Sequence, residues 1–403
     1  MMRVVVAHNF YRQSGGEDAV FTSESSLLEQ YGHEVIRHTV SNQDVDFHSR
    51  LKLAGATLWN HSEYKKIKKL LREKRPDIIH VHNTLPLLSP SIYYAAGAEG
   101  VPVVQMLHNY RPFCLNGVLY RDGHLCEDCI GRIPLPGVLH KCYRGSYAAS
   151  AGVLSLNVAY FRLLKTYQKH ISVFITSTQF AKNLFIKMGL KEDNIIVKPN
   201  LVKVFDSVEK IRVDSEARSG AIFVGRLDSR KGIWTLLSAI ERTNIPLTLV
   251  GDGDLRMEIE EWLLERPNLK VEITGWLDSV EVAGRIKRSS VLVLPSEFYE
   301  SFGNVIVEAF SCGIPVVTTN IGAQSELVQH GRTGYLYAYG DVDALAKALQ
   351  TLLDNPELSL VMGKNARREF EMKYTAERNY RALMDIYSGV IGTKSVFPDG
   401  NIV

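Results

Sequence analysis

Short apolar runs alternate along the chain with longer amphipathic stretches. In the first half, such runs at 3–7, 34–37, 77–82 and 101–107 predict buried strands, and amphipathic stretches at 17–31 and 60–74 predict helices. Strands that alternate with helices are typical of an α/β structure with a mainly parallel sheet.

The same alternation restarts after residue 200. The second series of predicted strands lies at 221–224, 247–250, 271–273, 291–294 and 315–318, with helices at 233–242, 254–265, 278–288, 303–312 and 341–353. A polar and charged stretch at 199–219 is predicted to link the two series. We therefore expect two doubly wound, Rossmann-like domains, at 1–200 and 201–374, with ligand bound in a central cleft at the carboxyl ends of the strands.

The composition of the 403 residues limits the classes of protein that remain. Apolar residues make up 45% and charged residues 23%, which excludes a wholly disordered or fibrous chain. The net charge of +3 argues against a nucleic-acid binder. No apolar run reaches the roughly 18–20 residues that span a bilayer, and the N-terminus lacks a signal-peptide pattern. We expect a cytoplasmic protein.

Charge is distributed unevenly between the two halves. Residues 1–200 carry 24 Lys and Arg against 16 Asp and Glu, which gives +8, and the remainder of the chain carries −5. Helix 60–74 is basic, with Ile67, Leu70 and Leu71 as its apolar positions. It fits either a solvated helix packed by those three residues or a helix on an anionic membrane surface. We favour peripheral attachment of the N-terminal domain to the inner face of the membrane.

Two glutamates flank a glycine turn in the second half. Glu300 precedes the turn, and Glu308 lies one turn into the helix that follows, which Ser301 or Asn304 is expected to cap. The free N–H groups of the first helical turn would form an anion site suited to a phosphate, and Gly303 would allow close approach. A pair of glutamates alone is more typical of capping or surface positions.

A basic loop follows the strand 221–224. Arg226 and Lys231 bracket this loop, so that two cations are able to converge on a diphosphate, although basic loops are usually just solvated. The Gly-x-Gly at 251–253 lacks the third glycine of a dinucleotide fingerprint and indicates a tight turn.

Together these stretches resemble the retaining glycosyltransferases of family 4 (glycosyl transferases group 1), which have the two-domain GT-B architecture. The resemblance covers nearly the whole chain and is carried by Gly15, Gly16, His108, 225–227, 231–232, 250–253, Glu300 and Glu308.

The resemblance implies a role for each of these positions. Arg226 and Lys231 would neutralise the diphosphate of a UDP- or GDP-type sugar donor, and Glu308 would hold its ribose. His108 and Glu300 would contact the transferred sugar. The remaining donor contacts implied are Gly15, Gly16 and the backbone of Phe302, Gly303 and Asn304. Residues 375–403 would cross back to the first domain.

The same resemblance implies transfer with retention, in which the leaving phosphate helps to deprotonate the acceptor. Because protein cations stabilise the leaving group, catalysis is expected to need no metal or other cofactor. The expected acceptor is a glycan or a lipid-linked saccharide of surface-polysaccharide synthesis. The alternatives are a non-hydrolysing nucleotide-sugar epimerase and a non-catalytic sugar-nucleotide-binding partner subunit.

Four cysteines fall in an insert at 110–145 that the family core does not need. They are Cys114, Cys126, Cys129 and Cys142. Four thiolates in a Gly- and Pro-rich loop of a cytoplasmic protein suit a structural zinc, with free thiols as the alternative. Because the insert follows His108, it is expected to shape the acceptor side of the site. Residues expected on that side are His82, Asn83, Tyr110 and Arg111.

Overall fold

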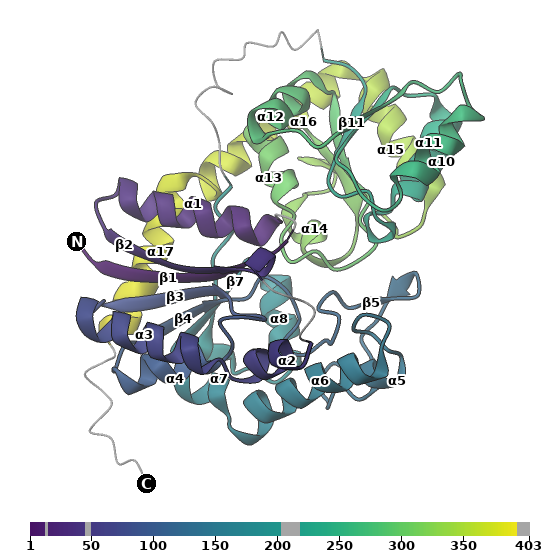
Figure 1. The fold of residues 1–403 in the computed structure, drawn as a ribbon. Coiled ribbons are helices and arrows are strands. Elements are labelled where there is room, and N and C mark those ends of the chain that lie inside the picture. The colour runs from purple at the N-terminus through teal and green to yellow at the C-terminus, as the bar shows by residue number, and fades with distance from the viewer. Residues whose placement is uncertain (13–14, 45–49, 203–217, 393–403) are drawn as a thin grey trace. The chain divides into compact units, whose positions relative to one another are not determined.

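The computed structural model describes residues 1–12, 15–44, 50–202 and 218–392. The chain divides into two compact units: unit 1 comprises 1–117, 127–201 and 376–403, and unit 2 comprises 118–126 and 202–375. Most of the predicted linker at 199–219, and the C-terminal segment from 393 onward, lie outside the described residues. Each unit contains a six-stranded sheet with helices packed against it (Figure 1), which confirms the predicted α/β class.

The sheet of unit 1 is parallel throughout, with strand order β2-β1-β3-β4-β7-β8. Its strands are β1 (Arg3–Phe10), β2 (Glu34–Ser41), β3 (Ile78–Asn83), β4 (Val103–Met106), β7 (Val173–Thr176) and β8 (Ile195–Val197). The Val4-Val5-Val6 run of β1 is buried because helices cover both faces of this sheet.

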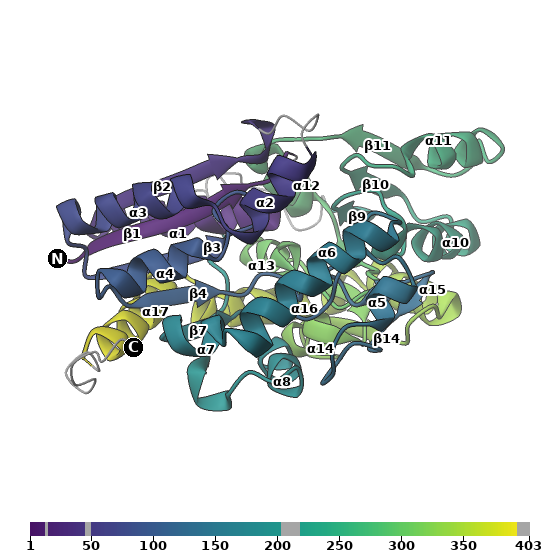
Figure 2. The same ribbon diagram turned by 60° about the horizontal axis from the view of Figure 1, so that its bottom comes forward.

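Helices α1 and α17 pack on one face of this sheet, and α3 and α4 on the other (Figures 1 and 2). Phe21 and Leu28 of α1 join Leu383 and Tyr387 of α17 in one core cluster, so the C-terminal helix belongs to unit 1. The helices of unit 1 are α1 (Gly16–Gln30), α2 (Arg50–Leu58), α3 (His61–Lys74), α4 (Ser91–Ala98), α5 (Pro136–Leu139), α6 (Tyr147–Asn157), α7 (Thr166–His170), α8 (Gln179–Lys187), α17 (Ala376–Gly392), a π-helical turn η2 (Val158–Leu163) and the 3-10 turns η1 (Asn42–Asp44) and η3 (Glu192–Asn194).

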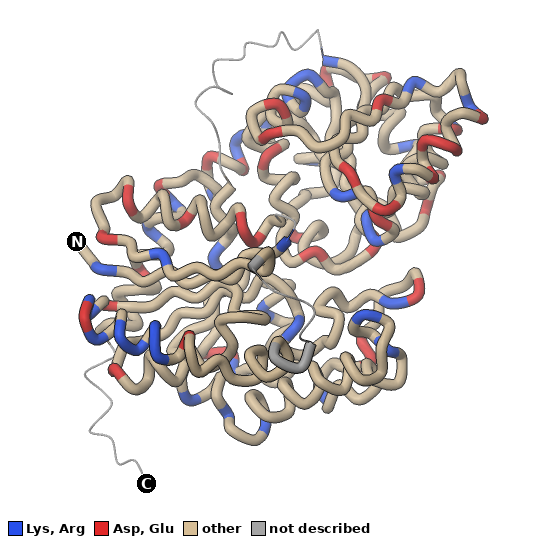
Figure 3. Tube along the Cα trace, in the orientation of Figure 1, with Lys and Arg blue, Asp and Glu red and all other residues tan. Residues whose placement is uncertain are grey.

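Helix α3 is the basic helix predicted at 60–74, and Figure 3 shows its Lys and Arg positions. Its apolar side chains Ile67 and Leu71 are fully buried in unit 1. The apolar face of the helix therefore packs against unit 1, as expected for a solvated helix held by these residues, and its charged side chains face the solvent.

Unit 2 repeats the arrangement with strand order β11-β10-β9-β12-β13-β14, again parallel. Its strands are β9 (Ala221–Val224), β10 (Leu247–Val250), β11 (Val271–Gly275), β12 (Val291–Leu294), β13 (Val316–Thr319) and β14 (Gly334–Tyr337). Its helices are α10 (Ile233–Thr243), α11 (Arg256–Leu264), α12 (Ser279–Arg288), α13 (Asn304–Ser311), α14 (Gly322–Leu327), α15 (Val342–Asp354), α16 (Pro356–Lys373) and the 3-10 turn η5 (Ser229–Lys231).

A short antiparallel hairpin, β5 (Tyr120–Arg121) and β6 (His124–Leu125), lies within the cysteine-containing insert. It groups with unit 2, where Tyr339 donates a hydrogen bond of 2.8 Å to the Gly123 carbonyl.

Candidate active site

The loop between β9 and α10 brings Lys231 against the segment that follows β12. Gly232 has φ +64°, and a Cβ there would lie 2.1 Å from the Pro295 carbonyl oxygen. Only glycine fits this combination of a left-handed backbone and a close approach. The close approach fixes the loop beside residues 295–300.

Lys231 and Glu300 form an ion pair in this place. Lys231 Nζ lies 2.6 Å from Glu300 Oε1, and the Ser296 hydroxyl donates to the same oxygen at 2.7 Å. Lys231 Nζ also lies 5.1 Å from the centre of the Phe298 ring. The structure thus brings together the predicted diphosphate cation and the predicted sugar-binding carboxylate, which are distant in sequence.

Arg226 lies in the same loop and is exposed. It forms no ion pair with another residue of the described ranges. Its neighbour Arg230 is instead held by Asp228 at 2.7 Å. Arg226 is therefore the arginine of this loop that is available to an anionic ligand.

Helix α13 begins immediately after this ion pair. Gly303, at φ +95°, is its N-cap residue, so the expectation that Ser301 or Asn304 occupies the cap is wrong. A glycine at this position has no side chain to accept hydrogen bonds from the first-turn N–H groups, and the N-terminus of a helix is suited to an anion. Phe302 is buried in the core of unit 2, so only its backbone is available to a ligand.

Glu308 lies one turn into α13 and is half-buried. Burial raises the pKa of its carboxyl to about 7. Within the described part of the chain, its carboxylate has no hydrogen-bond donor. A desolvated carboxyl of this kind suits the hydroxyls of a ribose, which would supply the missing donors.

The N-terminal glycine loop of unit 1 contains Gly15 and Gly16. Gly15 is the N-cap residue of α1, and its N–H donates to Asp18 Oδ2 at 2.9 Å. A Cβ on Gly15 would meet nothing within 4 Å, so the fold itself does not require glycine here. The open space above Gly15 is consistent with the predicted contact to a ligand.

His82 and His108, at the ends of β3 and β4, are in direct contact. His82 Nδ1 lies 3.0 Å from His108 Nε2, and the rings stack with centres 5.2 Å apart. Burial lowers the pKa of both imidazoles. Both rings are therefore neutral at pH 7, and each has one donor and one acceptor nitrogen.

The other three predicted acceptor-side residues differ in what they do. Asn83 holds its own turn, since it donates to the Asn9 carbonyl at 2.9 Å and accepts from the Leu85 N–H at 3.2 Å. Tyr110 is buried, and its N–H donates to the Gly117 carbonyl. Arg111 lines the cavity described next.

A cavity of about 950 Å³ opens at this end of the unit 1 sheet. His82, Asn83, His108 and Arg111 lie in its wall. Most of the remaining lining is apolar and comes from α2, α6 and the strand ends; it includes Leu53, Leu58, Met106, Phe113, Val153 and Leu156. A cavity of this size with a few polar groups is typical of a small-molecule binding site.

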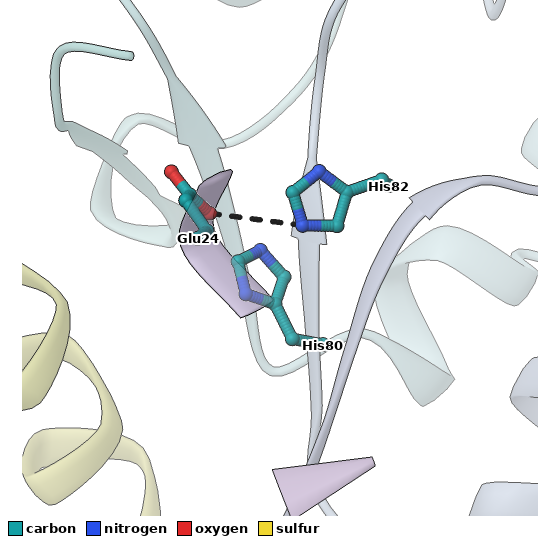
Figure 4. Close-up of side chains that lie close together, drawn as sticks. All are labelled: Glu24, His80 and His82. Atoms are coloured by element: carbon teal, nitrogen blue, oxygen red, sulfur yellow. Dashed lines mark ion pairs between the residues drawn. The ribbon is translucent and has the colours of Figure 1, made fainter. Parts of the chain in front are cut away.

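Sequence reasoning missed a second polar cluster in unit 1. Glu24, His80 and His82 have ligand atoms within 4.8 Å of one another and point toward each other (Figure 4). The alternation of His80 and His82 along β3 places both rings on one face, which is a signal the sequence contained. Glu24 and its partner Lys198 are 174 positions apart, and nothing in the sequence links them.

This cluster is the one group among the described residues in which three or more potential metal ligands meet that closely. The four cysteines of the insert are not such a group. The Cys114 thiol donates to Asn116 Oδ1 at 3.0 Å. The structural zinc therefore stays a prediction.

Two protein-family models match successive parts of the chain. Residues 12–204 match the model "Glycosyltransferase Family 4", and residues 208–369 match "Glycosyl transferases group 1". HepE of Anabaena, solved with UDP and glucose, aligns over 96% of this chain and all of its own at 18% identity and a TM-score of 0.67. Sucrose-phosphate synthase of Thermosynechococcus elongatus aligns over 98% of this chain and all of its own at 18% identity and a TM-score of 0.70.

The fold is therefore GT-B, and the chain belongs to glycosyltransferase family 4. An uncharacterized glycosyltransferase of Methanocaldococcus jannaschii is 30% identical over 50% of this chain and 57% of its own length. The O-antigen chain mannosyltransferase C of Escherichia coli is 30% identical over 43% of this chain and 47% of its own. The chain thus spans about half the length of the curated relatives it matches.

Proposed function

We propose that the protein transfers a sugar from a nucleoside diphosphate donor to an acceptor hydroxyl with retention of configuration. The observation that carries the proposal is the 2.6 Å contact between Lys231 and Glu300 beside the N-terminus of α13. Two neighbouring loops of unit 2 thereby combine a cation for a diphosphate with a carboxylate for sugar hydroxyls. The UDP bound by HepE, a structural relative, supports a donor of the UDP type.

In the proposed reaction the bond between sugar C1 and the phosphate oxygen breaks, and a bond from C1 to the acceptor oxygen forms on the same face. The acceptor proton passes to an oxygen of the departing diphosphate. Arg226, Lys231 and the N–H groups of α13 stabilise the negative charge that develops on the leaving group, so the proposal needs no metal. His108 is expected from the family pattern to contact the donor sugar.

The acceptor is proposed to bind in the cavity of unit 1. Its apolar walls favour an acceptor with an apolar portion, and Arg111 and Arg144 in the lining favour an anionic group such as a phosphate. We therefore favour a lipid-linked saccharide over a free glycan. A role in surface-polysaccharide synthesis agrees with relatives such as the O-antigen mannosyltransferase.

We also propose that the protein binds peripherally to a membrane, and the burial of two α3 side chains bears on which part of this helix would contact the lipid headgroups. Since Ile67 and Leu71 are buried, α3 can attract an anionic surface only through its exposed lysines and arginines. Among the described residues, no helix is both long and apolar enough to cross a membrane. Peripheral binding through α3 would therefore disappear as salt is raised.

The proposal is tested by replacing Arg226 and Lys231 singly with Ala. Each variant should lose roughly 100-fold or more in nucleoside diphosphate release while it melts within a few degrees of the parent. The matched control is Arg285→Ala, because Arg285 pairs with Glu272 on the surface of unit 2 and should be neutral. Normal turnover in either test variant would contradict the proposed role of these cations in stabilising the leaving diphosphate. Conversion of the donor without acceptor into an epimeric donor would favour the epimerase instead.

A further inference from the structure

A buried row of side chains in unit 1 connects Glu24 of α1 to His108 at the end of β4. Glu24 Oε2 lies 3.6 Å from His82 Nε2, and His82 Nδ1 lies 3.0 Å from His108 Nε2. Figure 4 shows the Glu24 carboxylate facing the His82 and His80 rings. Glu24 is 1% exposed and His82 3%, so water does not screen these groups.

Lys198 fixes the charge of this carboxylate. Its Nζ lies 2.6 Å from Glu24 Oε1, and it also donates to the Pro199 carbonyl and to Asn379 Oδ1, both at 3.1 Å. Burial alone would raise the pKa of Glu24, but Lys198 and the nearby histidines hold it below its usual value. Glu24 is therefore an anion whose Oε1 is occupied and whose Oε2 faces histidine nitrogens.

The ion pair with Lys198 argues against a metal site formed by Glu24, His80 and His82. The Glu24 charge is already matched by Lys198, and a divalent ion would add positive charge beside that ammonium group in a buried place. Buried Glu24 Oε2 and the Nε2 atoms of His80 and His82 have no hydrogen-bond partner. The Oε2 lone pairs are best matched by N–H groups on those nitrogens.

The positions of protons along the row then follow in order. A carboxylate oxygen only accepts, so the proton of neutral His82 lies on Nε2 and its Nδ1 is bare. The bare His82 Nδ1 must accept the hydrogen bond from His108, which places the proton of His108 on Nε2. We infer that Glu24, acting through His82, holds His108 in this tautomer and leaves its Nδ1 as a hydrogen-bond acceptor for substrate.

The groups packed around the row agree with this assignment. The Tyr387 hydroxyl lies 2.7 Å from His80 Nδ1, so a neutral His80 that accepts a hydrogen bond from this hydroxyl carries its own proton on Nε2, toward Glu24. His8, whose ring centre is 6.2 Å from that of His82, is bound by Asp18 at 2.7 Å. Glu17 accepts from Asn109 at 2.7 Å next to His108.

Glu24 is thus a positioning residue in this account, which rests on the proposed function for the contact of His108 with the sugar. A buried carboxylate that sets a histidine tautomer is the logic of the Ser-His-Asp triad, in which the amide variant keeps the geometry and loses activity. Here the effect is passed through a second imidazole.

The test is the ¹⁵N spectrum of histidine-labelled full-length protein at pH 7, in which protonated and bare ring nitrogens resonate in separate ranges. The His108 signals are identified by their loss in His108→Gln. The parent protein should show His108 protonated on Nε2. Protonation on Nδ1 in the parent overturns the inference without the need for any other variant.

The decisive variant is Glu24→Gln. Since Lys198 can only donate, it holds the oxygen of the new carboxamide and turns the NH₂ toward His82. That donor forces the His82 proton to Nδ1, and the His108 proton must then move to Nδ1 as well. The matched control is Glu63→Gln, because Glu63 is a buried glutamate of α3 that also pairs with a histidine, His38, and a lysine, Lys66.

We expect the His108 tautomer to reverse in Glu24→Gln and to stay unchanged in Glu63→Gln. Sugar transfer should fall roughly tenfold or more in Glu24→Gln with little change in the KM for the donor. An unchanged tautomer in folded Glu24→Gln overturns the inference. Absence of transfer by the parent with every donor would defeat the proposed function and leave the tautomer result standing.

Discussion

Lys231 Nζ lies 2.6 Å from Glu300 Oε1, although the two residues are 69 positions apart in the chain. One follows β9 and the other follows β12, and these neighbouring parallel strands end at the same edge of the unit 2 sheet. The pair is partly enclosed, with 19% of the lysine side chain and 13% of the glutamate side chain exposed. The fold therefore holds a cation and a carboxylate in contact without a bound ligand.

Replacing the carboxylate of this pair should expose its role. Glu300→Gln keeps the shape but removes the ionic partner of Lys231 and one strong acceptor for sugar hydroxyls. We expect turnover to fall roughly 100-fold in a protein that still folds. Measurement of initial rates with the preferred donor checks this.

The control for that substitution is Glu297→Gln. Glu297 is a nearby glutamate whose carboxylate accepts from the Thr235 hydroxyl at 2.6 Å. It should keep activity within a few-fold of the parent. Equal losses in the two variants would show that the effect comes from general disturbance of the loop.

Glu308 should make stability depend on pH in a direction opposite to that of most carboxylates. Its pKa is raised to about 7 from 4.5 by burial, so the folded protein binds this proton more tightly than the unfolded chain does. The contribution of Glu308 to the free energy of unfolding is therefore present below about pH 4.5 and is lost as the pH rises to about 7.

The variant Glu308→Gln removes this dependence. Its Tm relative to the parent should be higher at pH 8 than at pH 5, by a few degrees, as differential scanning calorimetry would measure. The same difference at both pH values would mean that Glu308 is ionised without cost in the folded protein.

The buried histidines of unit 1 should make the fold sensitive to acid. Burial lowers the pKa of His80 to about 4, so between pH 6.5 and 4 the unfolded chain binds a proton that the folded protein does not. The contribution of His80 to the free energy of unfolding is thus fully present above pH 6.5. It is lost as the pH falls from 6.5 to 4, by up to about 3 kcal/mol.

Denaturant unfolding of the parent and of His80→Gln from pH 7 to pH 4 measures this effect. The curve of unfolding free energy against pH should be flatter for His80→Gln. Parallel curves would exclude His80 as a source of the acid sensitivity.

Gly232 should tolerate no side chain. A Cβ there meets the Pro295 carbonyl oxygen at 2.1 Å in addition to the strain of φ +64°. Gly340 has a similar φ of +71° with nothing within 4 Å of its Cβ, so Gly340→Ala isolates the backbone strain. We expect Gly340→Ala to cost roughly 1 kcal/mol and Gly232→Ala clearly more, with lower activity because Lys231 is displaced. Equal destabilisation would contradict the close approach.

The sequence predicted the long elements with a clear hydrophobic periodicity well, and the exact ends of helices less well. The sequence predicts a helix at 303–312, and α13 spans Asn304–Ser311 with Gly303, at φ +95°, as its N-cap residue in place of Ser301 or Asn304. Helix α6, Tyr147–Asn157, was not predicted, since its run of small residues has little amphipathic periodicity.

The candidate site of unit 2 could be predicted because its residues lie in strand-to-helix turns that contain recognisable sequence motifs. The Glu24–Lys198 pair could not, because its partners come from distant elements and only the packing of α1 against the sheet brings them together. The sequence also left open whether the apolar face of the basic helix packs against the protein or lies on a membrane. The structure shows Ile67 and Leu71 buried in unit 1.

Metal-independent cleavage of a nucleoside diphosphate sugar is tested most directly with chelator-treated protein and a panel of UDP- and GDP-sugars. Release of nucleoside diphosphate is followed for each donor, alone and with a lipid-linked acceptor, in the parent and in Lys231→Ala. We expect that one donor is cleaved without added metal, that the acceptor accelerates this cleavage, and that Lys231→Ala abolishes it. Failure of every donor to be bound or cleaved by the folded parent would contradict this expectation.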